Sequence, residues 1–206
     1  LFEPVYNQIV TNNREAGHWH ADETRWFVFA HIEGKSGYNW WLWVFKSEES
    51  VVFVLDKSRS ADVPRHHFEN MEHPAILSCD RYSAYKCVIN EKGGILVAAW
   101  CWSHVRRDFL DLAKTRPEIE PWAMKWVWEI GHLYYQNDLR LKNMENPESF
   151  SLHDNELKQR LDRMKASCDN QLADETLDQN CRKVLESLDN HWDGLTVFAD
   201  HPAVPM

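Results

Sequence analysis

The stretch Ala75-Ile76-Leu77-Ser78-Cys79-Asp80 is a short, mostly apolar run that ends at an acidic residue. A second acidic residue, Asp22, lies in His18-Trp19-His20-Ala21-Asp22-Glu23-Thr24, just before the apolar run 26–30. A carboxylate on or at the end of a buried strand is costly unless it is paired or binds a cation. If the two strands are neighbours, their carboxylates would form half of a divalent-metal site.

The residues around Asp22 predict three consecutive strands, at 19–30, 40–46 and 51–55. A turn at Gly34-Lys35-Ser36-Gly37 separates the first two strands, and a polar turn at Ser47-Glu48-Glu49-Ser50 separates the second and third. Turns this short favour antiparallel pairing between successive strands. We therefore expect a three-stranded antiparallel meander.

The residues around Asp80 predict alternating helices and strands. Ser60 is expected to cap the first helix, with Pro64 in its first turn, and Gly93-Gly94 ends the second. The expected elements, in order helix, strand, helix and strand, are 61–70, 75–79, 83–90 and 95–99. Both strands are apolar on both faces, as central parallel strands covered by helices should be.

A meander followed by two helix-connected parallel strands is the ribonuclease-H-like order. We therefore predict an α/β fold with a mixed five-stranded sheet flanked by helices. In this topology the first and fourth strands lie side by side in the middle of the sheet, so Asp22 and Asp80 could share a cation.

The sequence after Trp102 changes to a helical period. Ser103 is expected to cap a helix that reaches about Lys114, and Pro117 can begin another. Apolar residues recur at intervals of three and four through the rest of the chain, which predicts amphipathic helices, with 143–155 as a loop. The expected domains are a core at 1–116 (best defined at 17–110), a helical insertion at 117–192 and a tail at 193–206.

Composition limits the classes of function. The net charge of −9, with −2 in residues 1–110 and −7 in 111–206, argues against a free-standing nucleic-acid binder. Any DNA affinity then needs local patches, bound metal or another domain. Five cysteines without a CxxC pair fit reduced thiols in a cytoplasm. No apolar run approaches a membrane span and no secretory leader is visible. Because the first residue is Leu1, we expect a fragment of a longer chain.

Six stretches in chain order resemble transposases of the insertion-sequence-66 family. They are His20–Trp26, Trp41–Phe45, Ser58–Ala61, Asp80–Lys86, Cys101–Phe109 and Val197–Met206. The resemblance covers nearly the whole chain. It implies a ribonuclease-H-like core with an Asp-Asp-Glu metal site, in enzymes that cut and join mobile DNA.

The resemblance also implies roles for individual residues. Asp22 matches the first catalytic and metal-binding carboxylate and Asp80 the second, and the third is a Glu on a helix after Val204-Pro205-Met206. The fragment alone is therefore expected to have an incomplete site. Two Mg²⁺ (or Mn²⁺) ions are expected, with Asp22 bridging both and Asp80 holding one. The implied partners are transposon-end and target DNA, together with other copies of the full-length protein.

Further residues are predicted to contact DNA or to support the metal site: Glu23, Thr24, Arg81, Lys86, His104, Arg106 and Arg107. Strand alternation places Glu23 opposite Asp22, as a supporting or ion-paired residue, and Thr24 on the same face as Asp22. Arg106 and Arg107, near a helix start, could bind phosphate. They could equally form ion pairs with Asp108 or Asp111.

Two other functions compete with the transposase interpretation. The missing third carboxylate and the net charge suit a non-enzymatic DNA- or protein-binding module. His18, His20 and Asp22 share a strand face, which suits a His/Asp metallohydrolase. An aromatic stripe, which suits base stacking or core packing, comprises Trp122, Trp126, Trp128, Tyr134 and Tyr135.

Overall fold

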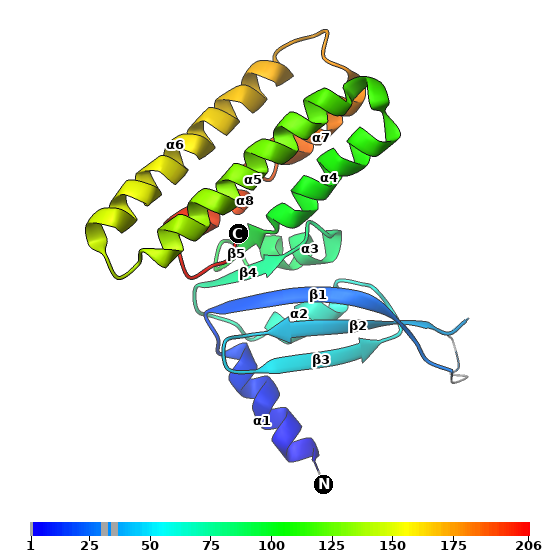
Figure 1. Ribbon diagram of the computed structural model, residues 1–206. Helices are drawn as coiled ribbons and strands as arrows, with labels where there is room; N and C mark the ends of the chain where they lie inside the picture. Colours follow the sequence, from blue (N-terminus) through cyan, green and yellow to red (C-terminus); the bar gives the residue numbers. More distant parts are fainter. Residues whose placement is uncertain (1, 30–32, 34–36) are drawn as a thin grey trace. The chain divides into compact units, whose positions relative to one another are not determined.

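The computed structural model describes residues 2–29, 33 and 37–206 (Figure 1). The chain divides into two compact units, Leu1–Ala99 and Trp100–Met206, which are described separately. The sequence predicts a boundary at residue 116 between a catalytic core and a helical insertion, and this boundary stays a prediction. Residues 34–36 of the expected turn at 34–37 lie outside the described residues.

The first unit is built on a five-stranded sheet of order β3-β2-β1-β4-β5. Its strands are β1 (His18–Phe27), β2 (Asn39–Lys46), β3 (Val51–Asp56), β4 (Ala75–Cys79) and β5 (Leu96–Trp100). β1 pairs antiparallel with β2 and parallel with β4, and β2 pairs antiparallel with β3. The predicted meander and the central pair of first and fourth strands are thus confirmed.

Side chains of the sheet alternate between two faces, because successive residues of a strand point to opposite sides. On one face the aromatic side chains of Trp19, Trp43 and Phe45 are fully buried. Two helices supply their contacts: the Phe68 ring from α2 lies 5.0 Å from that of Trp19, and the Tyr85 ring from α3 lies 5.9 Å from that of Trp43. The core of this unit therefore lies on the face opposite Asp22.

The helices of the first unit are α1 (Glu3–Arg14), α2 (Asp62–Phe68) and α3 (Ser83–Glu91). The sequence did not predict α1, which is attached to the sheet through the buried side chain of Asn13. Asn13 Nδ2 donates to Ser50 O over 3.2 Å, and the Trp19 indole donates to Asn13 O over 2.7 Å. The N-cap position of α2 is Ala61, so the prediction of Ser60 as the cap is wrong by one residue. The Ser60 hydroxyl instead accepts a hydrogen bond from Asp62 N over 3.4 Å.

The second unit is helical. Its elements are α4 (Trp102–Thr115), the short 3₁₀ helix η1 (Pro117–Ile119), α5 (Glu120–Lys142), α6 (Pro147–Leu172), α7 (Gln179–Asp189) and α8 (Trp192–Asp200). Its core is a continuous apolar cluster from α4 to α8, in which the buried Trp102 indole donates to Leu195 O over 2.6 Å. Among the described residues, no helix has the length and apolar character of a membrane span.

Two predictions for this unit are wrong. Helix α4 begins at Trp102 with Cys101 in the N-cap position, so Ser103 lies inside the helix and does not cap it. The predicted loop 143–155 is helical from Pro147 onward, because Asn146 accepts a hydrogen bond from Ser149 N over 3.1 Å and caps α6. An Asn cap followed by Pro at the first helical position is a favourable helix start.

Candidate metal-binding site at the ends of two neighbouring strands

The pairing of β1 with β4 determines how Asp22 and Asp80 lie relative to each other. The last matched pair in this parallel register is His20 with Ser78. Asp22 lies two residues beyond this pair within β1, and Asp80 lies two residues beyond it in the chain, one residue after the end of β4. Because side chains two residues apart on a strand share a face, Asp22 lies on the face of His20.

Each aspartate is held by a nearby main-chain amide. Glu23 N donates to Asp22 Oδ1 over 2.9 Å, and Tyr82 N donates to Asp80 Oδ1 over 2.9 Å. One hydrogen bond occupies only part of a carboxylate, which has about four lone-pair positions. Asp22 is exposed and Asp80 half-buried. Both residues therefore have oxygen donors left for a cation.

Glu23 is the buried acid of this region, and its side chain is 1% exposed. It forms an ion pair with the Arg59 guanidinium, whose Nε lies 2.8 Å from Glu23 Oε1, and it accepts from the Tyr85 hydroxyl over 2.6 Å. This ion pair is one of the two roles expected for Glu23, and a supporting role at a metal site stays a prediction. Burial raises the pKa of Glu23, against the opposing effects of Tyr85 and Arg59.

Arg59 connects the segments that carry the two aspartates. Its guanidinium carbon lies 4.6 Å from the ring centre of Trp41 and 3.9 Å from that of Tyr82. The Tyr82 hydroxyl donates to Arg59 O over 2.6 Å. A chain of contacts thus runs from Glu23, next to Asp22, through Arg59 to Tyr82, two residues after Asp80. No role was predicted for Arg59, although it lies in the stretch Ser58–Ala61 that carries part of the resemblance.

Two histidines share the face of Asp22. His18 Nε2 lies 2.8 Å from Ser78 Oγ, and the His18 and His20 rings are 4.7 Å apart. Burial, together with His20 and Lys46, lowers the pKa of His18 to about 4. Burial and Lys46 also lower the pKa of His20. Within the described ranges, no group of three or more His, Cys, Asp or Glu residues could hold a metal ion.

The other predicted residues have different surroundings. Thr24 is exposed on the face of Asp22. Burial and Arg81 lower the pKa of Lys86, while Asp80 raises it. In the second unit, His104 is half-buried on α4, while Arg106 and Arg107 are exposed. Asp111, one of their expected ion-pair partners, contacts Lys114 instead, at 3.4 Å.

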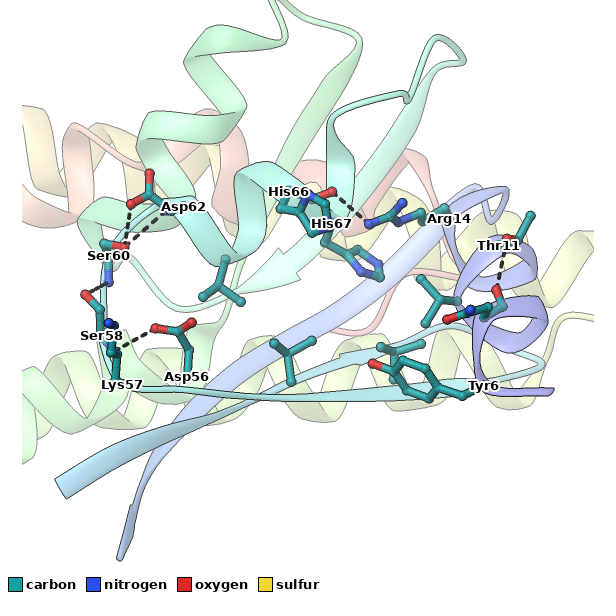
Figure 2. Close-up of a pocket in the computed structure, with 15 residues that line it drawn as sticks. Tyr6, Thr11, Arg14, Asp56, Lys57, Ser58, Ser60, Asp62, His66 and His67 are labelled. Carbon is teal, nitrogen blue, oxygen red and sulfur yellow. Dashed lines mark hydrogen bonds between the residues drawn. The ribbon is translucent and has the colours of Figure 1, made fainter. Parts of the chain in front are cut away.

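A cavity of about 770 Å³ lies on the other side of the sheet, lined by residues of α1, β3 and α2 (Figure 2). Val52 and Val54, which pair with Phe45 and Trp43, form part of its wall on the face opposite Asp22. None of the predicted site residues lines this cavity. The candidate metal site is therefore a separate feature on the opposite face.

The strand order and the mixed pairing of the sheet define an α/β domain of the ribonuclease-H-like class. The sequence profile of the Transposase IS66 family matches residues 1–206, and the chain belongs to this family. Membership implies the use of divalent metal and the binding of DNA. A comparison with curated proteins found no match.

Proposed function

We propose that this domain carries out the metal-dependent cleavage and strand transfer of DNA by a transposase. The observation that supports the proposal most directly is the parallel pairing of β1, which contains Asp22, with β4, which ends one residue before Asp80. Carboxylate oxygens are the ligands that Mg²⁺ prefers, so these residues fit a pair of Mg²⁺ or Mn²⁺ ions.

In this mechanism the carboxylates of Asp22 and Asp80 would hold the cations. When bound, such a pair of cations activates the attacking hydroxyl and stabilises the leaving oxygen of an in-line displacement. The backbone amides of Glu23 and Tyr82 orient the two carboxylates. A further carboxylate is proposed as the third ligand of these cations.

The contacts of Arg59 support a positioning role. Both Glu23 oxygens are engaged, Oε1 by Arg59 and Oε2 by Tyr85, so Glu23 acts through the strand that it anchors. Arg59 holds this strand against the segment that begins at Asp80. Metal ligands need orientation by surrounding residues, because small displacements weaken the metal site.

Positive residues near the aspartates are proposed to contact the DNA backbone. Arg81 and Lys86 follow Asp80 in the chain and lie close to it. Phosphate contacts of this kind position DNA without reading its sequence. Thr24 is proposed to hydrogen-bond near the metal ions. The proposed setting is a homo-oligomer of the full-length protein in a reducing cytoplasm, consistent with five free cysteines.

The full-length protein with Asp22→Asn or Asp80→Asn tests the proposal. Each change removes a metal-binding charge, and we expect strand cleavage in Mg²⁺ to fall by roughly 1,000-fold or more. DNA that carries the transposon ends is the substrate, and Glu48→Gln, an exposed change in the β2–β3 turn, is the control. Unchanged cleavage in either aspartate variant would refute the proposal.

A second candidate is a module that binds DNA or protein without catalysis. It is favoured by the finding that no described group of three or more potential ligands could hold a metal ion. Efficient Mg²⁺-dependent nicking by residues 1–206 alone would exclude this candidate. Purified fragment and a supercoiled plasmid are sufficient for the assay.

A further inference from the structure

Helices α4 and α5 of the second unit border two adjoining hollows of about 690 and 670 Å³. Both hollows include Arg106 and Gly131 in their walls, so they form one continuous surface. We call it the α4–α5 groove and define it by Arg106, Arg107, Lys114, Lys125, Trp128 and Gly131.

Gly131 keeps the groove open where the two hollows meet. It is an exposed residue within helix α5, and a Cβ atom placed there would meet nothing within 4 Å. Glycine costs about 1 kcal/mol relative to alanine in a helix interior. The backbone of α5 is therefore accessible to a bound molecule at this position.

The groove concentrates positive charge in an acidic unit. Residues 100–206 contain 13 Lys and Arg against 19 Asp and Glu, a net charge of −6. The groove nevertheless has four basic residues, and Asp111, paired with Lys114 at 3.4 Å, is the carboxylate that lines it. Within the described chain, Arg106, Arg107 and Lys125 form no ion pair. An anion would satisfy these charges.

The spacing of the basic residues fits a polyanion better than a small anion. Arg106 and Lys114 are eight residues apart on one helix, which corresponds to about 12 Å along its axis. One strand of duplex DNA presents a phosphate about every 3.4 Å along its axis. The α4 wall is therefore long enough to face more than one phosphate of a strand.

Trp128 adds an aromatic surface at the groove. Its side chain is 64% exposed, and its ring lies 3.7 Å from that of His132 in an edge-to-face arrangement. The predicted aromatic stripe is thus divided: Trp126 is in the core, whereas Trp128 and Tyr135 are exposed. An exposed indole next to basic residues is a suitable platform for an unpaired base.

From these observations we propose that the α4–α5 groove binds DNA, with Arg106, Arg107 and Lys125 on the phosphates and Trp128 stacked on an unpaired base. This inference rests on the proposed function, because it takes DNA as the substrate. It goes beyond that function by assigning a DNA-binding surface to the helical unit, away from metal chemistry.

The test is a titration of full-length protein with fluorescent DNA in EDTA, as a duplex and as a single strand, over a series of salt concentrations. We expect Arg106→Ala/Arg107→Ala to weaken binding about tenfold or more and to reduce the slope of log K against log salt by about one to two. Trp128→Ala should weaken single-strand binding by about fivefold or more and duplex binding less.

The matched control is Lys142→Ala/Lys183→Ala, which removes two charges from exposed positions of the same unit outside the groove. It should change affinity less than twofold, and Arg106→Lys/Arg107→Lys should restore the salt slope. The proposal would be overturned if the control and Arg106→Ala/Arg107→Ala had equal effects on affinity. It would also be overturned if the arginine variant lost oligomerisation while its DNA affinity stayed unchanged.

The same variants separate this inference from the metal mechanism. Asp22→Asn should abolish cleavage and leave the effect of the groove arginines on binding intact. If Asp22→Asn cleaves normally while the arginine variants still bind weakly, the metal mechanism is wrong and the groove assignment stands. If Asp22→Asn is inactive and the arginine variants bind like the control, the groove assignment is wrong.

Discussion

Arg59 combines an ion pair with two aromatic contacts on one guanidinium. Its side chain is 38% exposed, whereas that of its partner Glu23 is 1% exposed. The pair is therefore asymmetric: removal of the arginine leaves a buried carboxylate without its charge partner. Breaking a buried pair costs more than the pair itself contributes, because the remaining charge stays desolvated.

Arg59→Met is accordingly expected to lower the free energy of unfolding by about 2–3 kcal/mol, less than for a fully buried pair since Arg59 is partly solvated. Urea unfolding measures the change. Arg25→Met is the control, because Arg25 also lies near the Trp41 ring, at 5.8 Å. A loss no larger than that of Arg25→Met would mean that the Glu23 pair contributes little. Adding Glu23→Leu to Arg59→Met should recover part of the loss.

His67 makes stability depend on pH. Its imidazole is 3% exposed, its Nε2 donates to Asn13 Oδ1 over 2.9 Å, and its ring stacks on Phe45 at 4.0 Å. Burial, with Arg14 and His66 nearby, lowers the pKa of His67 to about 3. Between about pH 6.5 and 3 the unfolded state therefore binds a proton that the folded state does not.

Stability should consequently be full above pH 6.5 and fall as the pH drops toward 3, by up to about 1.4 kcal/mol per pH unit from this residue. Thermal unfolding between pH 4 and 8 measures the slope. His67→Gln should make it shallower, with the contributions of His18 and His20 remaining, while His66→Gln, a change at an exposed neighbour, should alter it much less. An unchanged slope in His67→Gln would assign the acid sensitivity to other groups.

At the scale of elements, a helix or strand could be predicted from the sequence where local interactions determine it. Strand β4 has the predicted bounds, because an apolar run of five residues between turn-forming segments identifies a buried strand. The N-terminal helix was not predicted: its attachment depends on the Asn13 side chain, whose partners lie more than 30 residues away. Tertiary contacts of this kind leave no periodic signal in a sequence.

The residues of the candidate site likewise fall into those that the local sequence identifies and those that only the folded sheet brings together. Asp22 and Asp80 could be singled out from their positions relative to apolar runs, and alternation correctly placed Glu23 on the opposite face. The link through Arg59 could not be predicted, since it joins three segments whose distances are set by the folded sheet. The start of α6 was predictable in principle, because Asn146 and Pro147 form a recognised cap pattern.

The cap of α6 gives a test at this scale. Asn146→Ala removes the side-chain oxygen that accepts from Ser149 N and should cost about 1 kcal/mol of unfolding free energy. Asn155→Ala, an exposed change inside the same helix, should have the opposite sign by a few tenths of a kcal/mol, since alanine favours helix. Guanidinium unfolding distinguishes the two. Equal effects would show that Asn146 does not act as a cap.

At the scale of the whole molecule, DNA binding has to overcome a net charge of −9. Residues 1–110 have a net charge of only −2. The two carboxylates at the proposed metal site therefore have a large effect on the local electrostatic potential. Without cations, Asp22 and Asp80 repel a phosphate, and bound cations reverse the sign of this interaction. Bound metal ions should thus control the affinity for DNA as well as the rate of strand cleavage.

Asp22→Asn/Asp80→Asn is therefore expected to bind DNA more tightly than the original protein in EDTA, by at least about threefold, because two repelling charges are gone. In Mg²⁺ the order should reverse, since only the original protein gains cations at the phosphate. The matched control is Glu48→Gln/Glu49→Gln, which removes two exposed charges in the β2–β3 turn and should be insensitive to Mg²⁺. Titration of full-length protein with labelled DNA gives both affinities. Identical Mg²⁺ responses in the two double variants would show that the aspartates do not hold cations against DNA.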